Sequence, residues 1–379
     1  MSATRLEQVR SLPTRLVAGL MTGTSMDGLD MALCRVEAGR PWAFELVATD
    51  EAPMPAALRA GLAAQGAMSL GEAARLDRAL GLWFADALAP LAERVGQPLD
   101  LIGSHGQTAY HEHGVTTVQL GEPAFLAVRF GCPVISDFRR NDIALGGCGA
   151  PLVPAIDRWL FGRPDAGVVA LNIGGIANLT AIPPEGPVTG FDCGPGNMVL
   201  DALARRFTGG RQAADLGGVF AARGRVRPEW LAPLLGQPFF ARQPPRSAGR
   251  EEFGEAFVEA LLARAAPADE AAWHDLFATA LELTVQGIAR SLESHVPFRP
   301  ASLIASGGGA RNPRLMARLA DVVAPVRLTT SDALGVPGDH KEAIAFALLA
   351  SARLDGLPGN LPEVTGAARP VLLGKITEC

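Results

Sequence analysis

The sequence predicts an α/β protein of two domains, each with a mixed β-sheet covered by helices. The chain has 379 residues, which is more than one domain usually contains. Strand-like runs alternate with amphipathic stretches at helical spacing up to residue 136, and the alternation begins again at residue 168. We therefore place one domain at residues 1–140 and a second at residues 141–379, with the C-terminal helix packing back on the first domain.

The first domain is expected to begin with three antiparallel strands and to continue with alternating helices and strands. Ser69 lies three residues before Glu72, and this spacing is typical of a capping box at the start of a helix. The predicted strands cover residues 16–36 as a β-hairpin, 42–49, 99–104 and 133–136. The predicted helices cover residues 55–66, 69–95 and 123–130. Strands joined by hairpins are antiparallel, and strands joined through a helix are parallel, so this order of elements predicts a mixed sheet.

The second domain repeats this architecture without a visible repeat in the sequence. Its predicted strands cover residues 168–173, 177–182, 188–191, 302–305 and 326–329. Its predicted helices cover residues 197–207, 251–265, 269–295, 313–323 and 341–354. Residues 209–250 are rich in Gly, Pro and Arg, so we expect an ordered loop over the ligand-binding cleft, in which residues 238–245 cannot form regular structure.

Composition excludes several classes of function. The formal net charge is −5 and no block of like charges occurs, so neither nucleic acid nor an anionic membrane is an expected partner. The five cysteines show neither CxxC pairs nor zinc-ligand spacing, and no apolar run approaches the roughly 18 residues of a membrane span. The sequence therefore predicts a cytoplasmic protein with a small-molecule partner.

Lysine occurs only at positions 341 and 375, and neither lysine follows a GxxxxG run. A Walker A loop and a protein kinase are excluded, because both need a lysine at the nucleotide phosphates. If the chain binds ATP, the ligands are hydroxyls, backbone N–H groups, arginine and Mg²⁺.

The turn of the predicted hairpin at residues 16–36 has the composition of a phosphate-binding loop. Gly23 and Gly28 can adopt positive φ and let a ligand approach the backbone closely. Hydroxyls beside unpaired N–H groups come from Thr22, Thr24 and Ser25. A hairpin whose polar tip faces water would have the same composition.

Two later strand-to-turn units, at residues 168–180 and 302–312, also run from β-branched residues into glycines. In the second of them, Gly307, Gly308 and Gly309 would let a flat ring such as adenine lie against the backbone, although a plain tight turn before a helix looks the same. Three such units in one chain favour a bound nucleotide.

Asp192 is the candidate general base. It ends a strand, and Gly-Pro-Gly then opens a helix at Asn197, so an anion at that helix N-terminus would lie next to the carboxylate. An aspartate that only caps a turn is an equally good explanation of the local sequence.

A second polar group follows the strand at residues 99–104. His105 and Gln107 lie in a tight turn at its end, where α/β sheets place ligand contacts, although a lone histidine is more often structural. Arg139 and Arg140 follow the next strand and could bind a carboxylate or phosphate in a two-pronged way, or form solvated salt bridges.

Together these motifs resemble the anhydro-N-acetylmuramic acid kinase family of the actin–hexokinase–chaperone ATPase superfamily, and the resemblance covers nearly the whole chain. The matching segments are MTGTSMDGLD at 21–30, SHGQT at 104–108, DFRR at 137–140, DIALGGCGAPLVPAID at 142–157, LNIGGIANL at 171–179, FDCGPGN at 191–197, GRE at 249–251, GGGARNPRLMARL at 307–319 and EAIAFA at 342–347. The resemblance implies two ribonuclease-H-like domains with an active-site cleft between them.

The resemblance also implies roles for individual residues. Asp192 would be the catalytic aspartate. ATP would be bound by Gly23, Thr24, Ser25, Met26, Asp27, Gly28, Leu29, Asp30, Gly174, Gly175, Asn178, Gly307, Gly308, Gly309 and Asn312. The sugar would be bound by His105, Gln107, Arg139, Arg140, Gly196, Asn197 and Glu342. Cys148 and Cys193 replace the Gln and Thr that the family usually has, which puts side-chain contacts from these positions in doubt.

The implied reaction is ATP-dependent opening and phosphorylation of 1,6-anhydro-N-acetylmuramic acid in murein recycling, with Mg²⁺ carried by ATP rather than by a dedicated protein site. Asp192 would take a proton from water as it attacks C1, while O6 leaves towards the γ-phosphate. The resemblance alone implies a homodimer. Two alternatives stay open: a hydroxyl kinase for free hexoses or N-acetylhexosamines, and a non-catalytic ATP-gated binding module.

Overall fold

The computed structural model describes residues 4–23, 26–63 and 68–379. The chain forms two compact units, Met1–Leu160 together with Asp339–Cys379, and Phe161–Gly338. The predicted boundary between residues 140 and 141 therefore lies inside the first unit, and residues 339–379 return to the unit that contains the N-terminus. Pairing between segments more than 200 residues apart produces this division, and such pairing leaves no local signal in the sequence.

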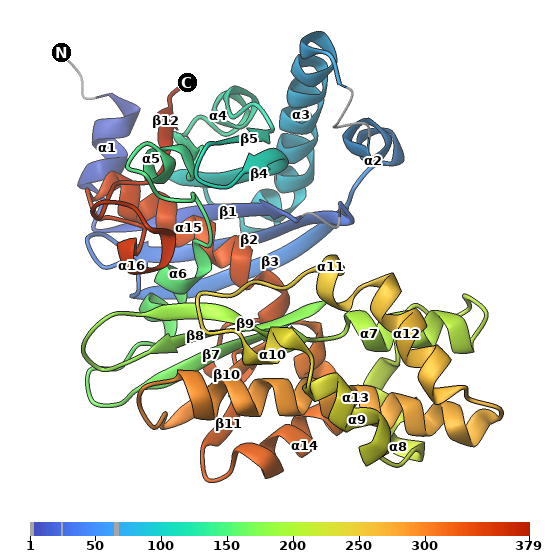
Figure 1. Cartoon of the computed structure of the whole chain (residues 1–379). Coiled ribbons are helices and arrows are strands. Elements are labelled where there is room, and N and C mark those ends of the chain that lie inside the picture. Colours follow the sequence, from blue (N-terminus) through green and yellow to red (C-terminus); the bar gives the residue numbers. More distant parts are fainter. Residues whose placement is uncertain (1–3, 24–25, 64–67) are drawn as a thin grey trace. The chain divides into compact units, whose positions relative to one another are not determined.

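The sheet of the first unit has the strand order β12-β6-β4-β1-β2-β3, and β5 pairs with β4 (Figure 1). Its strands are β1 (Thr14–Thr22), β2 (Gly28–Glu37), β3 (Phe44–Pro53), β4 (Leu101–Glu112), β5 (Thr116–Leu120), β6 (Val134–Ser136) and β12 (Lys375–Thr377). β1 pairs with β2 in the antiparallel sense and with β4 in the parallel sense. The sheet is therefore mixed, as the sequence predicts.

Helices cover both faces of this sheet. They are α1 (Arg5–Ser11), α2 (Ala56–Ala63), α3 (Leu70–Val95), α4 (Ala124–Phe130), α5 (Arg140–Ile143), α6 (Val153–Phe161), α15 (Lys341–Leu354) and α16 (Pro362–Thr365). The predicted capping box is confirmed, because Ser69 Oγ accepts from the Glu72 N–H and Glu72 Oε2 accepts from the Ser69 N–H. α15 lies directly on β1 and β4, where a Cβ at Gly19 or Gly103 would overlap the helix backbone.

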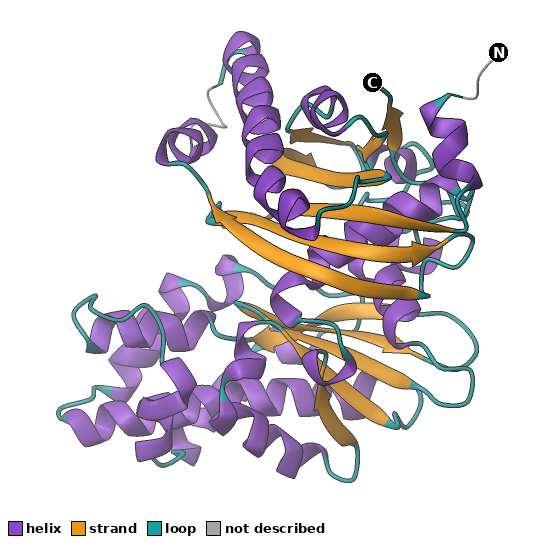
Figure 2. Ribbon diagram, turned by 180° about the vertical axis from the view of Figure 1, so that it is seen from behind, coloured by secondary structure: helices purple, strands orange, loops and turns teal. Residues whose placement is uncertain are grey.

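The sheet of the second unit has the strand order β11-β10-β7-β8-β9. Its strands are β7 (Val168–Ile173), β8 (Ile176–Ile182), β9 (Thr189–Pro195), β10 (Ser302–Ser306) and β11 (Arg327–Thr330). β7 is parallel to β10 and antiparallel to β8, so this sheet is mixed as well. Figure 2 shows strands and helices layered in each unit, and the predicted fold class is confirmed.

The helices of the second unit pack around a central long helix. They are α7 (Met198–Phe207), α8 (Val219–Arg223), α9 (Pro228–Leu235), α10 (Pro238–Ala241), α11 (Arg250–Phe253), α12 (Glu255–Ala265), α13 (Glu270–His295) and α14 (Pro313–Val323). α13 is buried along most of its length and contacts α7, α8, α9, α14 and β9. Its apolar residues therefore join the sheet and the helical layer in one core.

The region predicted as a loop at residues 209–250 contains three helices, α8, α9 and α10. The prediction that residues 238–245 cannot be regular is wrong for α10. Pro238 takes the first helical position, where its missing N–H costs nothing, and Phe239 is buried against Phe253. Tertiary packing of the phenylalanines overrides the local proline signal.

Candidate functional site

The polar turn between β1 and β2 is held by β4. Thr22 Oγ1 donates to Gln107 Oε1 at 2.6 Å, and Gln107 Nε2 donates to the Gly23 carbonyl at 3.2 Å. Thr22 and Gln107 are also partners in the parallel β1–β4 pairing, and both are buried. Gln107, expected to contact the sugar, thus fixes the start of the turn. The predicted contacts of Thr24 and Ser25 lie outside the described residues.

The remaining hairpin residues differ in what they can offer a nucleotide. Leu29 packs its side chain into the core, so only its backbone can reach a ligand. Gly28 lies close to β3, where a Cβ would stand 2.8 Å from the Ala52 carbonyl oxygen. Burial raises the pKa of Asp30 to about 6, and the charges of Asp27 and Glu342 add to this rise. Because burial destabilises the charged form of Asp30, a nearby cation would stabilise that form.

The buried side chain of His105 pairs with the half-buried side chain of Arg139. Arg139 Nε and Nη2 lie 3.1 and 2.9 Å from His105 Nε2, and Arg139 Nη1 donates to the Gly149 carbonyl at 2.8 Å. Because arginine only donates, Nε2 accepts and Nδ1 carries the hydrogen towards the Gly106 carbonyl at 2.7 Å. Burial lowers the pKa of His105 to about 3, and the Arg139 charge adds to this effect. His105 is a neutral residue that positions Arg139.

The other two sugar-binding candidates of this unit are exposed. Arg140 donates through Nε to the Thr117 carbonyl at 3.2 Å, and its Nη1 lies 3.4 Å from Asp137 Oδ2. Glu342 is exposed in the first turn of α15. Its neighbour Lys341 pairs with Asp157 at 3.0 Å inside the unit. This ion pair holds the start of α15, and it uses one of only two lysines in the chain.

In the second unit, the glycine turn predicted to bind ATP, at Gly174 and Gly175, meets the segment predicted to bind the sugar, at Gly196 and Asn197. The Gly196 N–H donates to the Gly175 carbonyl at 2.9 Å, and the Asn197 N–H donates to the Gly174 carbonyl at 2.7 Å. A Cβ on Gly196 would overlap the Gly174 carbonyl oxygen, so only glycine allows this approach. The β7–β8 turn and the start of α7 thus form one rigid corner.

The third glycine segment lies beside this corner. Gly307 has φ +81, and a Cβ there would stand 2.6 Å from Asn172 Oδ1. Gly308 is exposed, and a Cβ on it would lie 3.5 Å from Asn197 Nδ2. Asn312 Oδ1 caps α14 by accepting the Leu315 N–H at 3.1 Å. A structural role is therefore shown for the Asn312 side chain.

Asp192 lies on β9 at the end of a polar row that crosses the sheet. Ser306, Asn172, Asn178 and Asp192 are directly opposite one another on β10, β7, β8 and β9. Directly opposite residues face the same side. Their neighbours along the strands, such as Leu171 and Cys193, belong to the apolar core. The row is therefore on the face opposite that core, and Asn178 is the neighbour of Asp192.

The segment after α10 holds Asp192 in place. Asp192 Oδ2 accepts the Ala248 N–H at 2.7 Å, and the Asp192 carbonyl accepts Arg246 Nε at 2.8 Å. Burial raises the pKa of Asp192, although the Ala248 hydrogen bond and the Arg246 charge act in the opposite direction. A half-buried carboxylate with a raised pKa has the strength that a general base needs.

Sequence reasoning missed Arg246 and Ala248. Arg246 is only 7% exposed, and it also donates to the Arg242 carbonyl and to Ser291 Oγ. The only local signal is an arginine in a Gly- and Pro-rich stretch, and that stretch was predicted as a loop. Its partner Asp192 is more than 50 residues away in the chain.

Comparison with known proteins gives the class of enzyme first. Residues 15–379 match the family model described as anhydro-N-acetylmuramic acid kinase, so the chain is an enzyme of the kinase class. The anhydro-N-acetylmuramic acid kinase of Vibrio parahaemolyticus is 41% identical over 95% of this chain and 97% of its own. That of Streptomyces coelicolor is 43% identical over 95% of this chain and 93% of its own.

One solved structure aligns with 90% of this chain and 96% of its own, at a TM-score of 0.45 and 11% identity. It is the activator of the 2-hydroxyisocaproyl-CoA dehydratase from Clostridium difficile with bound ADPNP. The matching family model and relatives that are more than 40% identical over nearly their full length decide the assignment. This chain belongs to the anhydro-N-acetylmuramic acid kinase family, and the family predicted from the sequence is confirmed.

Proposed function

We propose that this chain uses ATP to open 1,6-anhydro-N-acetylmuramic acid with water and to phosphorylate O6, giving N-acetylmuramic acid 6-phosphate and ADP in murein recycling. Family membership supports the reaction, and the environment of Asp192 carries the assignment of the base. Because Asp192 Oδ2 accepts the Ala248 N–H, we assign Asp192 Oδ1 as the atom that accepts the proton of the attacking water.

One carboxylate is enough for the bond changes of the proposed reaction. Asp192 accepts a proton from the water, whose oxygen bonds to C1 while the C1–O6 bond breaks. The freed O6 bonds to the γ-phosphorus of ATP, and ADP leaves. Capture of O6 by the phosphoryl group replaces the acid that a glycosidase needs to protonate its leaving group.

The glycine turns of the second unit fit a nucleotide. Gly175 and Gly308 are exposed, and the packed backbone of Gly174, Gly196 and Gly307 leaves these turns without side chains that would shield them. We propose that residues 23–30 take the phosphates and residues 307–312 take the adenosine.

Among the described residues, no group of three or more His, Cys, Asp or Glu side chains is arranged to hold a metal. Because the family is a kinase family, we propose that Mg²⁺ arrives with ATP, where it would neutralise phosphate charge, and that Asp30 is the carboxylate of the hairpin that benefits from it.

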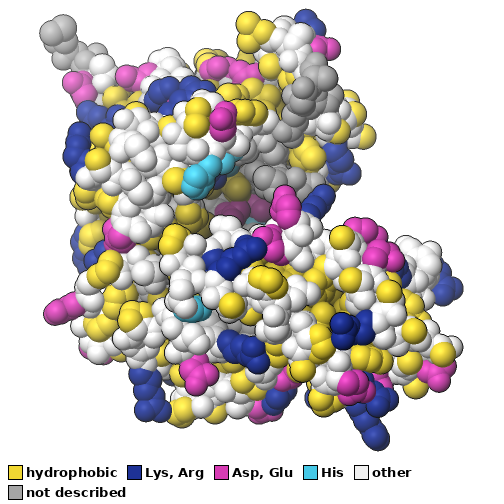
Figure 3. All heavy atoms as spheres, viewed as in Figure 1, with side chains coloured by type: hydrophobic (Ala, Val, Ile, Leu, Met, Phe, Trp, Pro, Cys, Tyr) yellow, Lys and Arg dark blue, Asp and Glu magenta, His cyan; other side chains and the backbone are white. Residues whose placement is uncertain are grey.

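Several observations support a small-molecule enzyme of the cytoplasm. On the face seen in Figure 3, acidic and basic side chains are interspersed rather than gathered by sign. All five cysteines are free thiols, as expected in a reducing compartment. No helix in the described part of the chain is both long and apolar enough to span a bilayer. A homodimer stays a prediction.

Two incubations test the reaction. The purified chain is given ATP with the anhydro sugar or with free N-acetylmuramic acid, in water enriched in the heavy oxygen isotope. We expect turnover of the anhydro sugar and one heavy oxygen at C1 of the product, detected by mass spectrometry. Phosphorylation of the free sugar alone would instead support the hydroxyl kinase. Slow ATP hydrolysis that ignores both sugars would support the non-catalytic module.

A further inference from the structure

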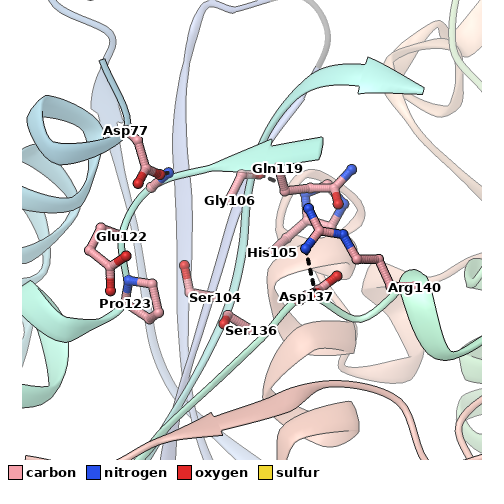
Figure 4. Close-up of a pocket in the computed structure, with 11 residues that line it drawn as sticks. Asp77, Ser104, His105, Gly106, Gln119, Glu122, Pro123, Ser136, Asp137 and Arg140 are labelled. Carbon is pink, nitrogen blue, oxygen red and sulfur yellow. Dashed lines mark hydrogen bonds and ion pairs between the residues drawn. The ribbon is translucent and has the colours of Figure 1, made fainter. Parts of the chain in front are cut away.

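The polar pocket of the first unit belongs to a site that is already described. It has a volume of about 150 Å³, and His105 and Arg140, two residues predicted to bind the sugar, line it (Figure 4). The Ser104 hydroxyl in its wall finds no partner among the residues that the structure describes. A cluster of charged side chains that the proposed mechanism leaves without a role lies in the second unit, around Glu252.

Glu252 lies in the first turn of α11 and holds the backbone just before this helix. Its Oε2 accepts the Gly249 N–H at 3.0 Å, and its Oε1 accepts Arg242 Nη1 at 3.1 Å. The Arg242 guanidinium in turn lies 5.8 Å from the centre of the ring of Phe239, which is buried in the core. Glu252 therefore has a fixed position between Gly249 and Arg242.

These contacts close a ring that begins and ends at Asp192. The Ala248 N–H, which binds Asp192 Oδ2, is one residue before the Gly249 N–H. On the other side of the ring, the Arg242 carbonyl accepts Arg246 Nη1 at 2.9 Å, and Arg246 Nε donates to the Asp192 carbonyl at 2.8 Å. The Arg246 carbonyl also accepts the Asp192 N–H at 3.1 Å. The segment that carries Ala248 is therefore attached at both ends.

Glu252 and Arg246 act on the charge of Asp192 in opposite directions. Burial raises the pKa of Asp192, and the Glu252 charge adds to this rise. The Ala248 hydrogen bond and the Arg246 charge lower it. The hydrogen bond from Gly249 and the charge of Arg242 lower the pKa of Glu252 itself, against the effect of burial. Glu252 is therefore an anion at neutral pH.

Two further titratable side chains near the ring are neutral. Burial lowers the pKa of His295 on α13, whose Nε2 lies 3.4 Å from Arg246 Nη1. Burial raises the pKa of Cys193, the residue after Asp192, to about 12. Neither side chain carries a charge at neutral pH, so the charge balance at Asp192 depends on Arg246 and Glu252.

We propose that Glu252 is a positioning residue for the general base: it fixes the backbone beside Ala248, so that Asp192 Oδ2 stays occupied and Oδ1 is directed to the attacking water. The inference rests on the proposed function, in which Asp192 accepts the proton of that water. Displacement of a reacting group by about 1 Å can cost about a hundredfold in rate. A backbone N–H that has to place one carboxylate oxygen therefore needs support from outside its own segment, and Glu252 supplies it.

Two substitutions at Glu252 separate its hydrogen bond from its charge. Glu252→Gln keeps an acceptor for the Gly249 N–H, so kcat at neutral pH should stay within about threefold of the wild type. The loss of the charge lowers the pKa of Asp192, so the acid limb of the pH profile of kcat should move to lower pH. Glu252→Ala removes the acceptor as well, so kcat at neutral pH should fall about tenfold. The matched controls are Glu229→Gln and Glu229→Ala, at an exposed glutamate in the first turn of α9, and both should behave as the wild type.

The outcomes distinguish this proposal from the reaction on which it rests. A glutamate that only stabilises the fold would change urea unfolding without moving the acid limb. An unmoved limb in Glu252→Gln, or a fall in kcat of less than about threefold in folded Glu252→Ala, would therefore overturn the positioning role alone. If the wild type does not phosphorylate the anhydro sugar, or if Asp192→Asn keeps wild-type turnover, the proposed function fails instead. If Glu252→Ala does not fold, the acid limb of Glu252→Gln decides.

Discussion

Replacement of Asp192 by asparagine is the most direct test of the general base. The amide has nearly the shape of the carboxylate, and its oxygen can still accept the Ala248 N–H. Arg246 donates to the carbonyl of residue 192 rather than to its side chain, so that hydrogen bond survives as well. We therefore expect the free energy of unfolding to change by less than about 1 kcal/mol.

The effect on turnover should be much larger. A positioned general base contributes about a hundred- to ten-thousand-fold, so Asp192→Asn should lower kcat by about three orders of magnitude, or about 4 kcal/mol in the activation barrier. ADP release measures turnover, and calorimetry should show unchanged nucleotide binding. The control is Asp321→Asn on the exposed surface of α14. Turnover of Asp192→Asn within tenfold of the wild type would remove Asp192 from this role.

Three further predictions concern residues that hold the candidate site. Arg246→Met removes a charge that lowers the pKa of Asp192, so this pKa should rise and the acid limb of the pH profile of kcat should move to higher pH. An acid limb that does not move would contradict the influence of Arg246 on Asp192. The pKa of His105 is about 3 in the folded chain and 6.5 when unfolded, so the unfolded state binds the proton first. Stability should therefore fall below about pH 6.5, by up to about 1.4 kcal/mol per pH unit, and His105→Gln should flatten this slope in urea titrations. Gly196→Ala would force its methyl group into the Gly174 carbonyl. We expect the unfolding free energy to fall by about 1–3 kcal/mol and ATP binding to weaken. If the variant keeps the stability and the ATP affinity of the wild type, the close approach of Gly196 to Gly174 is refuted.

Local signals predicted the regular elements well. Alternating apolar runs indicated the β1–β2 hairpin, and the Ser69–Glu72 spacing indicated the start of α3. β4 was predicted to end at residue 104 but continues to Glu112, and β5 was not predicted. The sequence after residue 104 is polar, and its pairing with β5 rather than its own pattern makes it a strand. Packing of phenylalanines likewise made α10 a helix.

The sequence by itself determined the family and the fold class, because motifs and periodicity are written in residues close together in the chain. It also predicted the residues that carry the chemistry, and those roles stay predictions. Only the tertiary structure decided that His105 is a neutral support for Arg139, that Arg246 and Ala248 hold Asp192, and that the Ser104 hydroxyl finds no partner among the residues that the structure describes. Those properties depend on hydrogen bonds and burial. Both arise when segments far apart in the sequence exclude water from the same place, and no local pattern reports that event.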